Sequence, residues 1–251
     1  MIPADPVAWL RGPIPSHPSQ PVSPSEPLPL EEGYLRSLVG AYAEGWFPMA
    51  QPRQGQRYGP LRLYRSRARA LLPLDGSLHA SRSLGRLLRA RPFRLSLNQA
   101  FSAVVAACAD RPETWISPQL AAIYQRLHAA GFAHSVEAWQ GSTLAAGLLG
   151  IAIGRCWIGE SMAHLRPNAG NVLLVELTAA LEWGGFGLFD VQLSNPNLER
   201  FGCFSISDAD YTDQLRRARC RPARLRLGDD SLESHAWPPS DAKMGADKKQ
   251  T

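Results

Sequence analysis

The sequence predicts an α+β fold in which helices flank a mixed β-sheet, preceded by a small basic segment. Its 251 residues are 45% apolar and 20% charged, enough for one large domain or a modest domain with a small companion. Apolar residues recur with helical and strand periods in turn along the middle of the chain. Eleven arginines lie between Gln51 and Arg94 with a single acid, Asp75. The periodic part therefore predicts a packed domain, and the arginine-rich part a smaller one beside it.

The chain divides by composition into four parts. Nine of the 21 prolines fall in the first 30 residues, which predicts a disordered leader. The residues after Gly228 are polar and predict a disordered tail. Within the basic part we expect helices at Glu31–Gly45 and His79–Arg89. The predicted boundaries are 1–30 for the leader, 31–92 for the small basic N-terminal domain, 93–227 for the main domain and 228–251 for the tail.

The main domain is expected to begin with a strand and two helices. Alternating apolar residues predict a strand at Phe93–Leu97, and Asn98 is a candidate N-cap for a helix with apolar residues at 101, 104, 105 and 108. Ser117 and Pro118 supply the N-cap and first turn of a second helix, which Gly131 ends.

Three strands, a helix, a strand and a last helix are expected to follow. Short turns separate the three strands, which predicts an antiparallel meander. The expected bounds are Phe132–Trp139, Thr143–Ile153 and Arg155–Ser161 for these strands, Asn168–Trp183 for the helix, Gly187–Ser194 for the strand, and a final helix capped by Ser207. This order of elements resembles the N-acetyltransferase-like fold, a mixed sheet whose central strands splay to form a cleft.

The distribution of charge and cysteine restricts the classes of function. The arginine-rich stretch carries +10 and the rest of the chain −5, giving a net charge of +5, so we expect an anionic polymer as partner. A solvated basic surface, or an arginine bias set by genome composition, is the alternative. The sequence lacks a run of 18 apolar residues and a signal-peptide pattern, so we expect no membrane span. The four cysteines lack the spacing of a zinc site, so no metal is expected.

Polar side chains at the ends of apolar strands are the candidates for chemistry. Glu160 lies at the end of one predicted strand, and Asp190 and Gln192 lie two residues apart on the next. That spacing predicts that Asp190 and Gln192 share one face of the sheet. A carboxylate inside a sheet needs partners, because an unsatisfied buried charge is costly. A structural hydrogen-bond network and a catalytic or substrate-orienting pair both remain open on spacing alone.

Two features of the predicted helix at 168–183 have a functional and a structural interpretation. Leu174, Leu177 and Leu181 form an apolar stripe, which is typical of core packing. The turn before the helix corresponds to the phosphate-binding turn of coenzyme A enzymes with this fold, but Ala169 and Asn171 replace residues that the turn requires. A coenzyme A site is therefore disfavoured.

Over about residues 31–218 the chain resembles the bacterial leucyl/phenylalanyl-tRNA protein transferases. The motifs that carry the resemblance are Tyr42–Pro48, Ser77–Ser83, Thr114–Ile116, Ala133–Glu137, Gly159–Met162, Gly184–Phe186 and Asp190–Gln192. The family commonly has Phe-Pro-Trp where this chain has Phe47-Pro48-Met49, and Ser-Lys where it has Gly170-Asn171. Several ordered motifs over three quarters of the chain make coincidence improbable.

The resemblance implies an aminoacyltransferase that needs no cofactor. It would transfer leucine or phenylalanine from Leu-tRNA or Phe-tRNA to the α-amino group of proteins that begin with Arg or Lys, which marks them for degradation by the N-end rule pathway. By this resemblance Asp190 orients the Gln192 amide, Gln192 contacts and helps to deprotonate the attacking amine, and Glu160 holds an amino group. Orientation by Gln192, or a bridging water, is the alternative to proton removal.

The resemblance also implies two binding surfaces. Trp115 would stack on the terminal adenosine of the tRNA. The apolar pocket for the amino-acid side chain would be formed by Leu148, Trp157, Met162, Leu174, Leu177, Leu181 and Phe189. The basic helix that contacts the tRNA backbone would carry Arg82, Arg86, Arg89 and Arg91.

Two other functions stay open at this point. One is an acyl-coenzyme A N-acyltransferase of the same fold, and the other is an RNA-binding module without activity. For the transferase we expect a cytoplasmic monomer without membrane contact.

Overall fold

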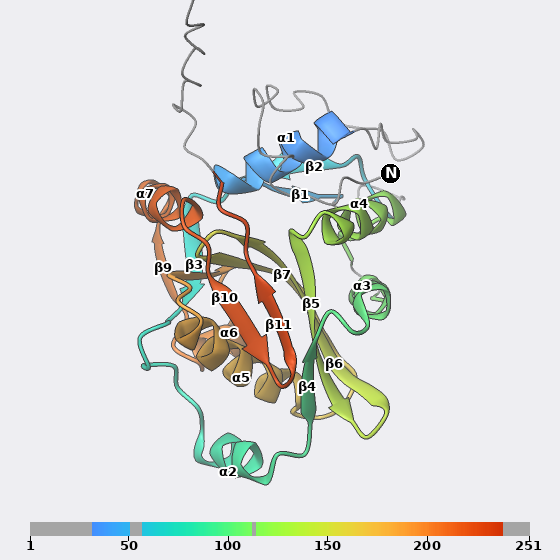
Figure 1. Ribbon diagram of the computed structural model, residues 1–251, viewed down its shortest axis with the longest axis vertical. Helices are drawn as coiled ribbons and strands as arrows, with labels where there is room; N and C mark the ends of the chain where they lie inside the picture. Colours follow the sequence, from blue (N-terminus) through green and yellow to red (C-terminus); the bar gives the residue numbers. More distant parts are fainter. Residues whose placement is uncertain (1–31, 51–56, 112–113, 238–251) are drawn as a thin grey trace, which may run out of the picture.

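The computed structural model describes residues 32–50, 57–111 and 114–237, which form a mixed seven-stranded sheet with helices on both faces (Figure 1). The strand order is β4-β5-β6-β7-β8-β3-β9. The strands of this sheet are β3 (Ala68–Leu72), β4 (Arg94–Leu97), β5 (Ala133–Gln140), β6 (Thr143–Ile153), β7 (Cys156–His164), β8 (Leu188–Gln192) and β9 (Phe204–Ser207). The predicted leader at 1–30 lies outside the described residues. The α+β class is confirmed.

Two apolar cores lie on opposite faces of the sheet. The first contains buried residues of α1, α3, α4 and α7, and the second those of α2 and α5. The helices are α1 (Glu32–Ala43), α2 (Arg82–Ala90), α3 (Phe101–Ala109), α4 (Pro118–Ala129), α5 (Ala169–Trp183), α6 (Pro196–Glu199) and α7 (Asp208–Arg219). Among the described residues, none of these helices is long and apolar enough to cross a membrane.

The predicted meander is confirmed, and the strands beside it diverge. Strand β6 has the predicted bounds and pairs antiparallel with both β5 and β7. Strand β7 then pairs in parallel with β8, but only from Cys156 to Ile158, opposite Leu188 to Asp190. Because β7 continues to His164 without β8 beside it, an opening forms between the two strands.

The boundary predicted at residue 92 is not a boundary of the sheet. Strand β3 belongs to the segment assigned to the small basic domain, yet it pairs antiparallel with β8 on one side and with β9 on the other. The sequence pattern missed this strand because it has only five residues and both of its partners lie more than 100 residues later. A separate two-stranded sheet is formed by β1 (Phe47–Met49) and β2 (Arg62–Tyr64).

The predicted disordered tail is wrong for its first ten residues. Strands β10 (Arg224–Leu227) and β11 (Asp230–Glu233) form an antiparallel hairpin, and Trp237 is buried in the first core. The apolar residues of β10 alternate with arginines, so one face of the strand packs while the other stays in water. The remainder of the predicted tail, 238–251, lies outside the described residues.

Helix caps were predicted with mixed success. Ser117 and Ser207 cap α4 and α7 as predicted, each accepting a hydrogen bond from a backbone N–H three residues later. Asn98 does not cap α3: its side chain instead accepts from the N–H of Ser135. The α3 N-cap is Ala100, whose N–H donates to Glu137 on the neighbouring strand. A carboxylate brought in by the sheet thus takes the place of a local cap.

Candidate active site

A buried ion pair lies where β8 meets β3. Asp190 and Arg69 are 0% and 1% exposed, and the guanidinium binds both carboxylate oxygens, with Nε 2.9 Å from each and Nη2 2.7 Å from Oδ2. Register explains the contact, because Asp190 pairs with Leu71 on β3, two residues from Arg69. Burial alone would lower the pKa of Arg69, but the charge of Asp190 outweighs it and raises that pKa, so the guanidinium stays charged.

Glu160 and Gln192 form the second half of the same network. Gln192 has a φ of 64°, which ends the regular pleat of β8. Its backbone N–H donates to Asp190 Oδ1 at 2.7 Å, and its side-chain Nε2 donates to Glu160 Oε1 at 3.1 Å. The expected contact between the Asp190 carboxylate and the Gln192 amide is therefore replaced: Asp190 holds the backbone of Gln192, and Glu160 holds its amide.

Glu160 is set up to exchange a proton near neutral pH. The residue is 6% exposed, and its burial raises the pKa of the carboxyl to about 7. The hydrogen bond from Tyr124 and the charge of Arg69 act in the opposite direction, and Asp190 adds to the increase. At pH 7 the carboxyl group is thus divided between its two protonation states. Such a group suits general acid–base chemistry.

Three buried tyrosines surround the two carboxylates. The Tyr124 hydroxyl donates to Glu160 Oε2 at 2.8 Å, and the Tyr211 hydroxyl donates to Asp190 Oδ2 at 2.6 Å. Burial, followed by the charge of Glu160, holds the pKa of Tyr42 and of Tyr124 well above its ordinary value, and burial with Asp190 does the same for Tyr211. These phenols therefore remain protonated at neutral pH, and those of Tyr124 and Tyr211 donate to the two carboxylates.

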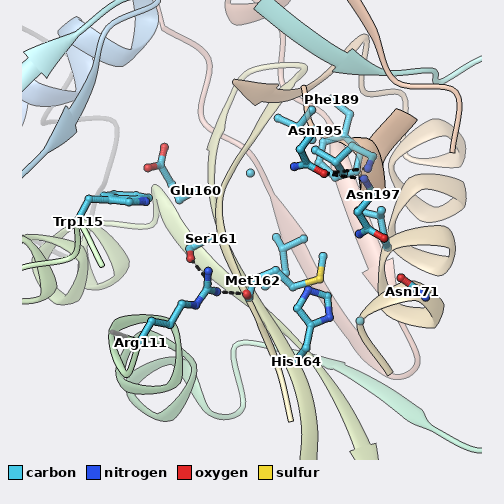
Figure 2. A pocket seen from close by; sticks show the side chains of 16 residues that line it. Arg111, Trp115, Glu160, Ser161, Met162, His164, Asn171, Phe189, Asn195 and Asn197 are labelled. Atoms are coloured by element: carbon cyan, nitrogen blue, oxygen red, sulfur yellow. Dashed lines mark hydrogen bonds between the residues drawn. The ribbon is translucent and has the colours of Figure 1, made fainter. Parts of the chain in front are cut away.

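A cavity of about 260 Å³ opens beside Glu160 in the gap between β7 and β8. Figure 2 shows Trp115, Glu160 and Arg111 on one side and Asn171, Asn195 and Asn197 on the other. Its remaining lining is largely apolar, from β6, β7, β8 and α5. Asp190 and Gln192 lie behind this wall rather than on it. A pocket of this kind suits a small apolar group attached to a polar reacting centre.

The cavity contains five of the eight residues predicted to bind the substrate: Trp115, Leu148, Met162, Leu174 and Phe189. The other three, Trp157, Leu177 and Leu181, are fully buried in the second core and do not line it. The leucine stripe of α5 thus contributes both to the cavity and to the core: Leu174 lines the cavity, and Leu177 and Leu181 pack in the core.

Comparison with known proteins decides the family. A sequence profile described as leucyl/phenylalanyl-tRNA protein transferase matches residues 71–216, more than half of the chain. A leucyl/phenylalanyl-tRNA–protein transferase of Synechococcus sp. (strain JA-3-3Ab) is 48% identical over 191 residues, covering 76% of this chain and 97% of the relative. The protein of the same name from Maricaulis maris is 44% identical over 185 residues, covering 72% and 84%. The chain belongs to the leucyl/phenylalanyl-tRNA protein transferase family.

The region that matches the family contains most of the site. Glu160, Asp190, Gln192 and the whole cavity lining fall within residues 71–216, as does the basic helix α2. The predicted tRNA-binding arginines of this helix, Arg82, Arg86, Arg89 and Arg91, are all exposed, and Arg91 forms its C-cap. Among the described residues there is no group of three or more His, Cys, Asp or Glu side chains that could hold a metal ion.

One departure from the family pattern has a steric explanation. A Cβ atom at Gly170 would lie 2.1 Å from Nδ1 of His164, which packs over this position at the cavity wall. Glycine fits beside the imidazole of His164 as it stands, and a serine at this point of α5 would require that exposed imidazole to shift.

Several residues of the site were missed by the sequence analysis. Arg69 and Tyr211 were not connected with Asp190, although the need of a buried carboxylate for partners was recognised. Arg69 lies among several other arginines in the sequence, and nothing in the sequence distinguished this buried arginine from its more exposed neighbours. Asn195 and Asn197 flank the proline that begins the short helix α6 and carried no signal of a binding site.

Proposed function

We propose that this protein transfers leucine or phenylalanine from aminoacyl-tRNA to the N-terminal amino group of proteins that begin with Arg or Lys, which creates an N-end rule degradation signal. Membership of the family supports the reaction class. The observation that carries the proposal for this chain is the position of Glu160, a carboxyl group with a pKa of about 7 at the wall of a cavity that polar and apolar side chains line together.

The reaction is the aminolysis of an ester. The nitrogen of the acceptor attacks the ester carbonyl carbon, a C–N bond forms, and the bond from that carbon to the ribose oxygen of the tRNA breaks. The attacking nitrogen must lose a proton, and the ribose oxygen must gain one. An α-amino group has a pKa near 8, so the amine is partly nucleophilic at neutral pH and positioning supplies much of the rate.

Glu160 is the residue suited to move this proton. Its ionised form accepts a proton from the attacking nitrogen, and its protonated form returns one to the leaving oxygen, so the carboxyl group ends in its starting state. Each oxygen of Glu160 already accepts one hydrogen bond, from Gln192 and from Tyr124, and retains a free lone pair for the substrate amine.

Gln192 and Asp190 then act as positioning residues. The amide of Gln192 holds Glu160, and the backbone of Gln192 is held by Asp190, whose own charge is balanced by Arg69. This arrangement favours orientation over direct proton removal as the role of Gln192, since an amide is a weak base and its donor group already points to Glu160.

The cavity and the basic helix provide the two binding surfaces of the proposal. Leu148, Met162, Leu174 and Phe189 would enclose the leucyl or phenylalanyl side chain, and Trp115 would stack on the terminal adenosine. The exposed arginines of α2 would contact the phosphates of the tRNA acceptor arm.

The divergence of β7 and β8 supports assignment to the N-acetyltransferase-like fold, in which the reacting group enters between two splayed parallel strands. We further propose that the protein acts as a monomer in the cytoplasm without membrane contact. Sedimentation at assay concentration tests the monomer, and cell fractionation tests the compartment.

A transfer assay tests the proposal directly. Purified protein is mixed with radiolabelled Leu-tRNA or Phe-tRNA and a peptide that begins with Arg. Label is expected in this peptide and absent from the same peptide with an acetylated N-terminus. Absence of label from every peptide that begins with Arg or Lys would refute the proposal, and protection of the fold by coenzyme A instead of aminoacyl-tRNA would favour an acyl-coenzyme A enzyme.

A further inference from the structure

A second cavity, of about 600 Å³, lies between the start of α2, the start of α5 and the end of α6. Its polar lining residues come from three separate parts of the chain: His79, Ser81, Ser83, Asn168, Asn171 and Arg200. Leu84, Leu87 and Phe201 form its apolar wall. The proposed mechanism uses none of these residues.

The second cavity adjoins the first. Asn171 lines both. Arg200, in the second cavity, donates a hydrogen bond to the side chain of Asn197, which lines the first. A ligand in the first cavity that extended past Asn171 and Asn197 would therefore reach the second. Asn171 and Asn197 both lie on the side of the first cavity opposite Trp115 (Figure 2).

The chemistry of the second cavity suits a ribonucleotide. Hydroxyl and amide groups can bind ribose hydroxyls, and Arg200 with the serine hydroxyls can bind a phosphate. None of the described residues that line it is acidic. The apolar wall offers a surface for the flat face of a ribose or base. A simple anion would not need this wall, and an apolar peptide would not need the polar groups.

The position of the second cavity also fits a strand that continues toward the basic helix. Ser83, Leu84 and Leu87 belong to α2, and the same helix carries exposed Arg82 and Arg86. A polynucleotide leaving the second cavity would thus meet the arginines of α2 directly.

We propose that the second cavity binds the single-stranded nucleotides that precede the terminal adenosine of the tRNA, with Arg200 on a phosphate and Asn171 at the passage between the two cavities. This inference rests on the proposed function, because it assigns the path of the same substrate. It adds a binding site between the aminoacyl pocket and the exposed arginines of the basic helix.

The experiment compares two stable substrate analogues. One is phenylalanine joined by an amide bond to 3′-amino-3′-deoxyadenosine. The other is the same group on the trinucleotide cytidylyl-cytidylyl-adenosine. Dissociation constants are measured by calorimetry with the full chain. The trinucleotide should bind about tenfold or more tightly than the nucleoside, as a charge-assisted contact to a phosphate allows. Arg200→Ala should remove most of this advantage and leave the affinity for the nucleoside unchanged, and His79→Ala should reduce it in part.

Arg216→Ala is the matched control, since Arg216 is an exposed arginine on α7 and lines neither cavity. Equal affinity of the wild-type chain for the two analogues would overturn the inference. Equal loss of trinucleotide binding in Arg200→Ala and Arg216→Ala would overturn it too, because the effect would then be general electrostatic attraction. If the wild-type chain bound neither analogue and transferred no amino acid from charged tRNA, the proposed function itself would fail, and the inference with it.

Discussion

Removal of the Asp190 carboxylate tests whether the buried ion pair is a structural requirement of the site. In Asp190→Ala the guanidinium of Arg69 would remain 1% exposed without its counter-ion. The Tyr211 hydroxyl and the Gln192 N–H would each lose their acceptor. Breaking a buried pair in this way typically costs about 3–5 kcal/mol of the free energy of unfolding. For a protein of this size we expect a fall in Tm of roughly 6–20 °C.

A double-mutant cycle separates the ion pair from its surroundings. Arg69→Met removes the cation and keeps a side chain of similar length, and the double variant with Asp190→Ala removes both charges. Because the double variant leaves no unpaired buried charge, its loss in free energy of unfolding should be smaller than the sum of the two single losses by about 1 kcal/mol or more. Urea unfolding followed by circular dichroism gives each free energy. Arg217→Ala is the control: Arg217 and Asp213 form an ion pair with side chains 77% and 60% exposed, and its loss should cost less than about 1 kcal/mol.

Two results would refute this reasoning. If Asp190→Ala were no less stable than Arg217→Ala, the carboxylate would not hold the network together. If the costs of Arg69→Met and Asp190→Ala simply added, the two groups would not interact in the folded protein. In the transfer assay Asp190→Ala should also lose activity while tRNA affinity stays nearly unchanged, and equal loss of both would contradict the separation of the buried network from the tRNA surface.

Three further predictions concern the reaction and its substrates. The rate of transfer should rise with pH through about 7 as Glu160 loses its proton. The Glu160→Gln variant should be slow and should retain only the rise near pH 8 that belongs to the acceptor amine. If the variant kept the rise at pH 7, Glu160 would be excluded as the proton acceptor. Replacing Arg86 and Arg89 by Ala should reduce the slope of log affinity for tRNA against log salt concentration by about 2, and an unchanged slope would place the tRNA elsewhere. Leu174→Ala should widen the cavity and raise the ratio of Phe to Leu transfer. Its control, Leu177→Ala, should lower the free energy of unfolding by about 2–5 kcal/mol and leave the ratio unchanged. If both variants changed the ratio equally, the cavity would not be the side-chain pocket.

Local signals in the sequence were sufficient for the middle of the fold. Strand β6 was predicted with its bounds, and Ser117 and Ser207 were identified as caps, because a cap and a strand period involve only neighbouring residues. Asn98 carried the same kind of signal and was misjudged as a cap. Its side chain is used by the backbone of Ser135, which the sheet brings close from 37 residues away.

The sequence predicted several residues of the candidate site but few of the contacts between them. Glu160, Asp190 and Gln192 do lie in one network, as their position at strand ends and the family motifs indicated. Arg69 was not anticipated as the partner of Asp190, because the pairing of β3 with β8 depends on register across 121 residues. A period in the sequence contains no information about such a distant neighbour.

The place of β3 in the sheet has a consequence for synthesis of the protein. This strand leaves the ribosome early, but its two neighbours β8 and β9 emerge more than 100 residues later. Until then its edges stay unpaired and the Arg69 side chain has no carboxylate to meet. Contacts of such long sequence separation form slowly and expose the nascent chain to aggregation. A ribosome that stalls before residue 190 would therefore leave a chain with most of these helices and no working centre, so the enzyme becomes competent only after β8 and β9 have been synthesised.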